Sequence, residues 1–366
     1  MQKYYKISDV QSKLNHLRNH GIQRGEYCGF EGLDEIYTAK KGYPLFIAGA
    51  PHSGKTEVTL ELLMAWSEIY GWKHCVCLGE NGDPEDIFAE LCSKYIGKSY
   101  RKMKEQGVVN QYAMTEVERT QAEYFVSEHF IVIGEEFEFN FDTDKNADVT
   151  IKSFYKYVSD VEKELGYQFD TTTFDPFNDI DEEDEKYGGR IDRYLKYALR
   201  YVRSVSRNFK RIDILVTHIA DLKPREDPKT GQRYYPMAMP NEWAGGRVWF
   251  RRGFTMLLIY RPPAGHAKNL DGTEFYTENE TMVVVQKAKP KGAAKLGARS
   301  LYFDWERNRF YEMLENGERR YAGKRTKATE QSGVGSTIKP NAAFDSEYDP
   351  DRRIEPTTTP DTDMPF

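Results

Sequence analysis

The sequence predicts an α/β protein: a largely parallel sheet with helices on both faces, closed by a C-terminal β-hairpin. Short apolar runs of four to six residues, typical of buried strands, alternate with longer segments whose apolar residues recur at helical spacing. Strands that are linked through helices run parallel and are buried on both faces. A glycine-rich segment at residues 49–56 lies between one such strand and one such helix.

The expected elements follow one another in a regular order. Strands are expected at residues 44–48, 74–78, 130–133, 169–174, 212–217, 255–260 and 281–286, and the hairpin at 299–304 and 309–313. Helices are expected at residues 57–70, 84–95, 115–128, 149–165 and 190–208. The third of these helices begins at Thr115, because Glu118 three residues later completes a capping box. Residues 219–242 are expected to form a polar loop.

The composition fits a globular protein of one or two domains. The chain has 366 residues, of which 39% are hydrophobic, and no apolar run approaches the length that spans a bilayer. The N-terminus has no apolar signal core, so we expect a cytoplasmic protein without membrane contact. The four cysteines fit no zinc-site spacing and are expected to pack in the core: Cys28, Cys75, Cys77 and Cys92.

Charge is distributed unevenly along the chain. The net charge is −6, which argues against a protein that binds nucleic acid over its whole surface. Residues 287–327 nevertheless contain 12 Lys/Arg and 5 Asp/Glu, whereas residues 341–366 contain 2 Arg and 7 Asp/Glu. An acidic C-terminal segment therefore offsets a basic region that precedes it.

The glycine-rich segment has the G-x-x-x-x-G-K-[ST] pattern of a phosphate-binding loop. The backbone N–H groups of such a loop point at an anion, and the N-terminus of the following helix adds partial positive charge. Lys55 can reach the β- and γ-phosphates of a nucleotide, and the Thr56 hydroxyl can hold Mg²⁺. The candidate nucleotide-binding residues are Gly49, Ala50, Pro51, His52, Ser53, Gly54, Lys55 and Thr56.

Three further polar residues follow expected strands at the point where each strand ends. In an open parallel sheet, ligands bind beyond the carboxyl ends of the strands. Asp175 follows the strand at 169–174 and can orient hydrated Mg²⁺. Glu80 can activate the attacking water as a general base, and His218 can hydrogen-bond the γ-phosphate. An acidic residue after a strand is also common in turns and caps, and His218 is equally compatible with a plain strand end.

Several segments in this order resemble the ring-forming, RecA-like replicative helicases of the DnaB and Twinkle type, particularly the Twinkle-like phage branch. The resemblance covers about residues 28–313. Its segments are Gly-Phe-Glu-Gly-Leu-Asp-Glu at 29–35, the loop at 49–56, Glu-Asn-Gly-Asp-Pro-Glu at 80–85, Lys-Tyr-Ile-Gly-Lys at 94–98, Met-Thr-Glu at 114–116, Phe-Asp-Pro-Phe-Asn-Asp at 174–179, Val-Thr-His at 216–218 and Lys-Ala-Lys-Pro-Lys-Gly at 287–292. The segments at 94–98 and 175–178 are the more specific ones, because many NTPases share the loop.

The resemblance implies a RecA-like P-loop NTPase core that hydrolyses ATP with Mg²⁺. By resemblance, Glu80 is the catalytic glutamate, Asp175 the Walker B aspartate and His218 the γ-phosphate sensor. Lys287 and Lys289 match two basic residues that reach into the nucleotide site of the neighbouring subunit. The family usually has arginine where this chain has Lys289. A lysine is a point charge without the bidentate fork of arginine, so stimulation in trans is expected to be weaker, or to come from Arg299.

Two loops are implied to face single-stranded DNA in the centre of a ring, probably a hexamer in the family's manner. The first, at 178–189, is strongly acidic and a poor phosphate contact on its own. The second, at 221–241, carries basic residues with Tyr234 and Tyr235 as candidates for base stacking. Solvated loop charges would look the same in the sequence. The candidate DNA-binding residues are Lys223, Arg225, Lys229, Arg233 and Arg247.

The flanking segments complete the expected domain organisation. Residues 1–27 form an amphipathic arm that packs on a neighbouring subunit or on its own domain, residues 28–322 form the ATPase domain, and residues 323–366 form a disordered acidic tail. About 40 residues precede the first expected strand, so a primase or loader is expected to be a separate polypeptide, as in a phage replication set. The end of the tail, at 360–366, resembles the acidic tip of bacterial single-stranded DNA-binding proteins, which docks on replication partners.

Three functions remain open from the sequence. The leading one is an ATP-dependent replicative DNA helicase or translocase that moves on single-stranded DNA as a ring with nucleotide sites between subunits. A recombinase-like, DNA-dependent ATPase that forms filaments would share the same core. A nucleotide-gated DNA clamp with little hydrolysis remains open because of the lysine at position 289.

Overall fold

The structure is a computed structural model, in which the parts of the chain described below are specific ranges of residues. They are residues 4–80, 82–103, 108–134, 139–140, 145–146, 149–180, 187–220, 222–226, 231, 233–268 and 273–323. The expected acidic loop at 181–186, the candidate Lys229 and the tail at 324–366 lie outside them.

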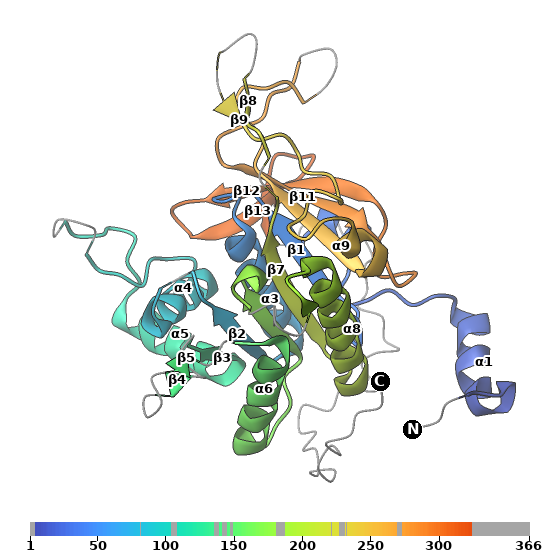
Figure 1. Ribbon diagram of the computed structural model, residues 1–366. Coiled ribbons are helices and arrows are strands. Elements are labelled where there is room, and N and C mark those ends of the chain that lie inside the picture. Colours follow the sequence, from blue (N-terminus) through green and yellow to red (C-terminus); the bar gives the residue numbers. More distant parts are fainter. Residues whose placement is uncertain are drawn as a thin grey trace.

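One large sheet forms the centre of the molecule (Figure 1). Its ten strands, from one edge to the other, are β14 (Arg319–Tyr321), β13 (Arg309–Met313), β12 (Gly297–Asp304), β11 (Glu280–Lys287), β10 (Thr255–Tyr260), β1 (Leu45–Gly49), β7 (Ile212–His218), β6 (Thr171–Asp175), β2 (His74–Leu78) and β3 (Phe130–Ile133). The six strands from β10 to β3 are parallel, and β11 to β14 continue the sheet antiparallel. The predicted parallel core and its closing hairpin are confirmed.

Helices cover both faces of this sheet, and each face has its own apolar core. One core contains side chains of α3 (Lys55–Tyr70), α4 (Pro84–Ile96) and α5 (Glu116–His129). The other contains side chains of α6 (Ile151–Leu165), α8 (Ile191–Phe209) and α9 (Arg247–Arg252). The short α2 (Glu31–Ile36) packs beside β12. The four cysteines are free and buried in these cores.

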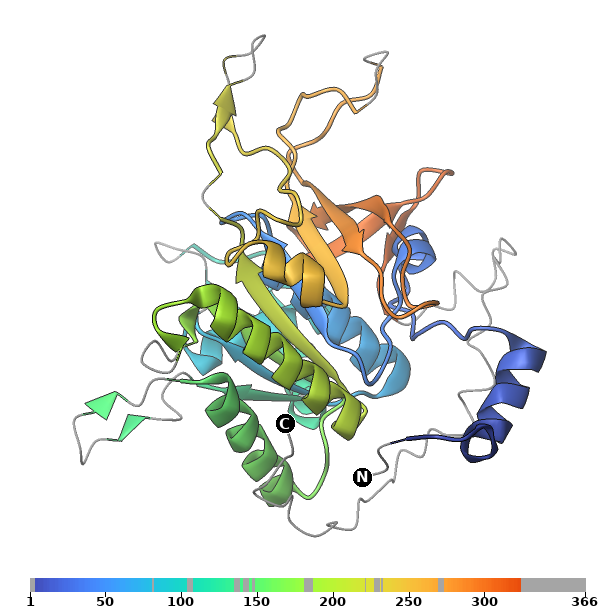
Figure 2. The same ribbon diagram turned by 45° about the vertical axis from the view of Figure 1, so that its right-hand side comes forward.

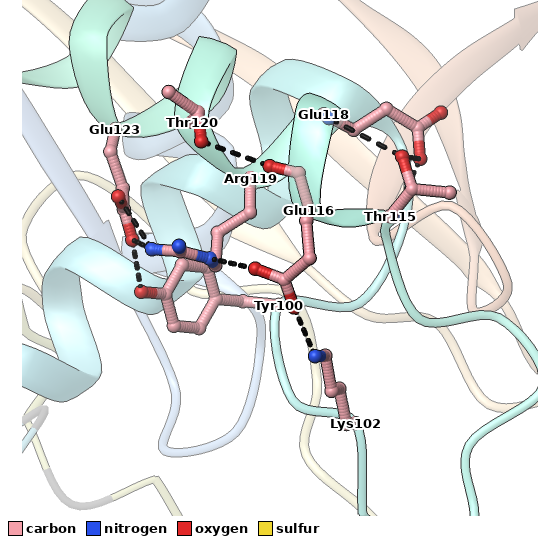
Figure 3. Close-up of polar contacts among 8 residues, drawn as sticks. All are labelled: Tyr100, Lys102, Thr115, Glu116, Glu118, Arg119, Thr120 and Glu123. Carbon is pink, nitrogen blue, oxygen red and sulfur yellow. Dashed lines mark hydrogen bonds and ion pairs between the residues drawn. The ribbon is translucent and has the colours of Figure 1, made fainter.

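The expected start of α5 is confirmed in detail (Figure 3). The N–H of Glu118 donates to Thr115 Oγ1 at 3.3 Å, and the Glu118 carboxylate accepts from the N–H of Thr115 at 2.8 Å. The Tyr100 hydroxyl donates to Glu123 Oε1 at 2.5 Å, and Lys102 pairs with Glu116. These contacts hold the loop between α4 and α5 against α5, and that loop later proves to line a cavity.

Some elements of the structure were missed in the sequence. The loop expected at 219–242 contains a short hairpin, and two residue pairs form another before α6. These elements are β4 (Phe139–Asn140), β5 (Lys145–Asn146), β8 (Arg225–Glu226), β9 (Arg233–Tyr234), β14 and the 3₁₀ turns η1 (Ile7–Val10) and η4 (Phe177–Asp179). Strands of two or three residues leave no period in a sequence, so only pairing reveals them.

The N-terminal arm is helical but does not pack on its own domain. Its helix is α1 (Gln11–His20), and none of its residues is buried. Leu14 and Leu17, which carry the apolar stripe, remain 40% and 47% exposed. Figure 1 shows α1 standing apart from the sheet and its helices. Of the two expected positions for the arm, packing on its own domain is therefore wrong for this chain by itself.

Buried ion pairs fix α3 against its neighbours. Lys94 of α4 is fully buried, and its ammonium lies 2.6 Å from Glu57 Oε2 and 3.4 Å from Glu90 Oε1. Burial raises the pKa of Glu57, but Lys94 more than offsets this and holds that pKa below its usual value. Arg309 of β13 lies 2.6 Å from Glu61, also on α3. The helix that follows the phosphate-binding loop is thus held from two sides by charges that water does not reach.

We predict that Lys94→Met strongly destabilises the fold. Met matches the length of the lysine but leaves the carboxylates of Glu57 and Glu90 without their cation. Breaking a buried ion pair in this way costs about 3–5 kcal/mol. Denaturant unfolding followed by circular dichroism measures the loss.

The matched control is Lys98→Met, four residues later. Lys98 pairs with Glu118 at 2.6 Å but is 45% exposed, so its loss should leave the unfolding midpoint nearly unchanged. Equal midpoints for the two variants would show that the buried pair is not a structural requirement.

Candidate active site

The predicted phosphate-binding loop links β1 to α3 and has the conformation that such a loop requires. His52 and Gly54 have positive φ of 60° and 86°. At Gly49 a Cβ atom would lie 2.4 Å from Ser53 Oγ and 2.5 Å from the carbonyl oxygen of Ile259, so only glycine fits there. The Ser53 hydroxyl is buried without a hydrogen-bond partner in the described structure. The loop is therefore closely packed from below, with an unused donor among its residues.

Lys55 and Thr56, at the start of α3, face the end of β6. Thr56 Oγ1 donates to Asp175 Oδ2 at 2.6 Å, and Asp175 is 3% exposed. Burial raises the pKa of Asp175, opposed by the Thr56 hydrogen bond and by Lys55. Burial also lowers the pKa of Lys55, whose ammonium donates to the carbonyl of Ala50 at 3.2 Å. A hydroxyl, a carboxylate and a lysine thus meet where a metal–phosphate complex would supply charges that each of them lacks.

Glu80 and His218 form the other side of the same site. His218 Nε2 lies 3.3 Å from Glu80 Oε1, and the Glu80 side chain is 56% exposed. The side-chain oxygen of Asn178 accepts hydrogen bonds from the His218 N–H at 2.9 Å and from Thr217 Oγ1 at 2.8 Å. Asn178 belongs to the segment at 174–179 that carries the family resemblance. Its amide fixes the end of β7 relative to the turn after β6.

Strand register explains why these residues meet. Gly49 of β1 pairs with His218 of β7, and Leu78 of β2 pairs with Asp175 of β6. The strands are parallel, so their last residues lie at one edge of the sheet, which we call the carboxyl edge. The structure therefore brings together all the candidates that the sequence placed at strand ends.

Lys287 and Lys289 lie at the opposite edge of the sheet. Lys287 pairs with Met256 near the start of β10, and the carbonyl of Lys289 accepts a hydrogen bond from Thr255 Oγ1 at 2.6 Å. Four residues of β10, or about 13 Å, separate Thr255 from Ile259, the partner of Gly49. The Lys287 ammonium instead donates to the carbonyl of Phe250. Neither lysine is positioned to contact a nucleotide on its own loop.

Arg299, the expected substitute for Lys289, is already paired. Its guanidinium donates to Glu35 Oε2 at 2.6 Å and to the carbonyl of Ala298 at 3.0 Å. Lys289 is exposed. Of these two residues, Lys289 is the one available to another molecule in this structure.

The candidate DNA-binding residues fall in two places. Lys223, Arg225 and Arg233 are exposed and lie on or beside the β8–β9 hairpin, which projects beyond the carboxyl edge (Figure 1). Arg247 is exposed at the start of α9, on the face of the sheet. Tyr234 packs edge-on against His266 with ring centroids 4.9 Å apart, whereas Tyr235 is 50% exposed. Tyr235 is thus the more accessible of the two expected stacking residues.

A cavity of about 590 Å³ adjoins the loop, and the sequence analysis missed it. Its lining combines the loop with four segments that are distant in the chain, and it includes His52, Gly54, Glu90, Tyr100, Tyr112, Arg261, Asn279, Phe303 and Trp305. Its volume lies within the range of small-molecule sites. Aromatic side chains beside an arginine give it the chemistry to hold a planar base. No spacing in the sequence signals such a set, because folding alone assembles it.

Comparison with known proteins gives a short match in sequence and a long one in structure. No family model matches the chain. Over 83 residues it is 32% identical to the Twinkle homolog protein, chloroplastic/mitochondrial, of Arabidopsis thaliana, a match that covers 23% of this chain and 12% of the plant protein.

Two solved structures share the architecture. The ATPase domain of one DnaB-like replicative helicase matches with a TM-score of 0.62 at 14% identity, over 85% of this chain and 100% of that one. A second DnaB-like replicative helicase, studied together with its interactions with primase, matches with a TM-score of 0.58 at 14% identity, over 84% of this chain and 67% of that one. The fold is that of a DnaB-like helicase ATPase domain. The expected RecA-like core and the resemblance to DnaB- and Twinkle-type proteins are confirmed at this level.

We predict that Gly49→Ala weakens nucleotide binding by at least about tenfold, or about 1.4 kcal/mol. The new methyl group would meet Ser53 Oγ and the Ile259 carbonyl, so the loop must move. Titration with a fluorescent ATP analogue measures the affinity.

Gly134→Ala is the matched control. A Cβ there has no atom of the described structure within 4 Å, so the affinity should stay at its wild-type value. Wild-type affinity in Gly49→Ala would contradict the geometry described for the loop.

Proposed function

We propose that this chain is an ATP-dependent DNA helicase motor that moves on single-stranded DNA as a ring, with each nucleotide site completed by the next subunit. The observation that carries the proposal is the division of the site between two edges of the sheet. The loop, Glu80, Asp175 and His218 lie at the carboxyl edge, and Lys287 and Lys289 lie at the opposite edge. Stacking of one edge on the other, subunit after subunit, completes every site.

The residues at the carboxyl edge have distinct roles in this proposal. The N–H groups of the loop and the Lys55 ammonium bind the phosphates of ATP. Thr56 and Asp175, which already share a hydrogen bond, hold Mg²⁺, and the ion neutralises charge on the β- and γ-phosphates. Glu80, exposed toward the site, accepts a proton from the attacking water.

His218 links hydrolysis to the DNA-facing part of the chain. It lies 3.3 Å from Glu80 and at the end of β7, directly before the segment that leads to the β8–β9 hairpin. Loss of the γ-phosphate changes the hydrogen bonds available to His218 and Glu80. The resulting shift passes to the hairpin, which carries Lys223, Arg225 and Arg233.

Partners follow from the same proposal. The α1 stripe, uncovered on its own domain, docks on a neighbouring subunit and supports a hexameric ring. One structural neighbour was studied with primase, and we propose that a separate primase or loader likewise serves this chain. The acidic segment at 341–366 is the proposed contact for such replication proteins. No helix in the described part of the chain is long and apolar enough to cross a membrane.

Unwinding of a forked DNA duplex tests the proposal. We predict ATP-dependent strand separation by the wild-type chain and none by Lys55→Ala. Glu80→Gln should keep nucleotide affinity and lose 10²–10⁴-fold, roughly, of its hydrolysis rate, the usual contribution of a general base.

Glu85→Gln is the matched control, because Glu85 is an exposed glutamate five residues later with no ion pair in the described structure. It should unwind like the wild type. Unwinding at full rate by Glu80→Gln would remove the catalytic assignment, and unwinding without ATP would remove the motor.

A further inference from the structure

The outer surface of α8 carries a continuous row of positive charge. The helix and its ends, residues 190–210, contain seven Lys/Arg and one Asp, in a chain whose net charge is −6. Six of the cations are exposed and fall within an arc of about 100° on a helix of 3.6 residues per turn. They are Arg193, Lys196, Arg200, Arg203, Arg207 and Lys210.

This row is not neutralised by carboxylates of the described structure. The one acidic residue of α8, Asp192, pairs with Arg190 at 3.0 Å. None of the six cations has an ion pair to a described carboxylate, unlike the exposed Lys98, Lys102 and Lys163, which each have one. Uncompensated like charges at helical spacing destabilise a helix, so their accumulation here costs stability that a purely structural face would not need to lose.

The short helix α9 extends the charged row sideways. It packs beside α8 on the same face of the sheet (Figure 2). Its own exposed residues include Arg247, Arg251 and Arg252, and Phe250 is 50% exposed among them. Arg203 of α8 lies over the ring of Phe254, directly after α9, at 4.8 Å. The cations of the two helices therefore form one surface, the α8–α9 basic face.

This face runs from one edge of the sheet to the other. Helix α8 begins near the carboxyl edge and ends before β7, which starts at the opposite edge. At that opposite edge the Lys287 ammonium contacts the carbonyl of Phe250. From Arg193 to Arg207 the row extends about 21 Å, with a cation about every 5 Å. Such a track matches a long polyanion better than a single anionic group.

We propose that the α8–α9 basic face binds the sugar–phosphate backbone of a nucleic-acid strand, independently of sequence and apart from the β8–β9 hairpin. The inference rests on the proposed function in one respect, namely that the motor acts on DNA. When subunits stack edge to edge, the faces of successive subunits join into one basic track.

The chemistry of the face favours nucleic acid over a protein or a lipid surface. Protein interfaces have an apolar core, and membrane-surface helices bury an apolar face. The exposed large apolar side chains of α8 and α9 are Ile191, at one end, and Phe250. Arginine is also suited to phosphate, which it contacts through two parallel hydrogen bonds.

A salt titration of DNA affinity tests the inference. The variant combines Lys196→Gln, Arg200→Gln and Arg207→Gln in the full-length chain, and the probe is a labelled single-stranded oligonucleotide followed by anisotropy. The logarithm of affinity falls with the logarithm of salt concentration by about 0.7 for each single-strand phosphate contact. We expect the slope to decrease by about 2 and the affinity at low salt to fall at least about tenfold.

The matched control combines Lys98→Gln, Lys102→Gln and Lys163→Gln, which remove the same charge from exposed lysines elsewhere. It should keep the wild-type slope. Melting temperature and nucleotide affinity, measured for both triple variants, show that each is folded.

A third variant separates this inference from the proposed function. It combines Lys223→Gln, Arg225→Gln and Arg233→Gln on the hairpin. Loss of slope in the hairpin variant, with a wild-type slope in the α8 variant, would overturn the inference and leave the helicase proposal standing. Absence of DNA binding by the wild type would overturn both. Tighter DNA binding by the α8 variant would show that the face holds a competing acidic segment such as 341–366, and would also overturn the inference.

Discussion

The hydrogen bond from Thr56 to Asp175 joins two parts of the fold that the rest of the site depends on. Thr56 begins α3, and Asp175 ends β6, which is separated from β1 by β7. The contact forms because parallel strands in register end together, so the loop after β1 lies over the end of β6. Glu80 and His218 reach the same place by the same rule, from β2 and β7. The chemistry of the site is thus a consequence of sheet register.

Buried charges hold the loop helix at the height that this register requires. Lys94 and Arg309 reach α3 from α4 and β13, and each pairs with a glutamate on α3 in a region without access to water. Arg309 also links the antiparallel extension to the loop, because β13 belongs to the strands that follow Lys287 and Lys289. The two edges of the sheet, and therefore both halves of the proposed site, are connected through one rigid set of contacts.

The sequence predicted those features whose signals are local. Strands β1, β2, β6 and β7, the loop at 49–56 and the residues at the strand ends follow from short apolar runs and from a motif of eight residues. The cavity beside the loop was not predictable, because Arg261, Asn279 and Phe303 meet only through pairing of strands far apart in the chain. The α8–α9 basic face likewise required the packing of α9 beside α8. The position of Lys289, opposite the loop, followed only from the register of β10 and β11.

Hydrolysis by mixed oligomers tests most directly whether neighbouring subunits share the site. Lys55→Ala removes the loop lysine, and Lys289→Ala removes the residue at the opposite edge, so each variant alone should be nearly inactive. In a random equal mixture, a quarter of the interfaces, roughly, pair an intact loop with an intact Lys289, since each half is present with a probability of about one half. The account predicts that mixing restores about a quarter of the wild-type ATPase rate. A mixture no more active than its separate components would contradict it.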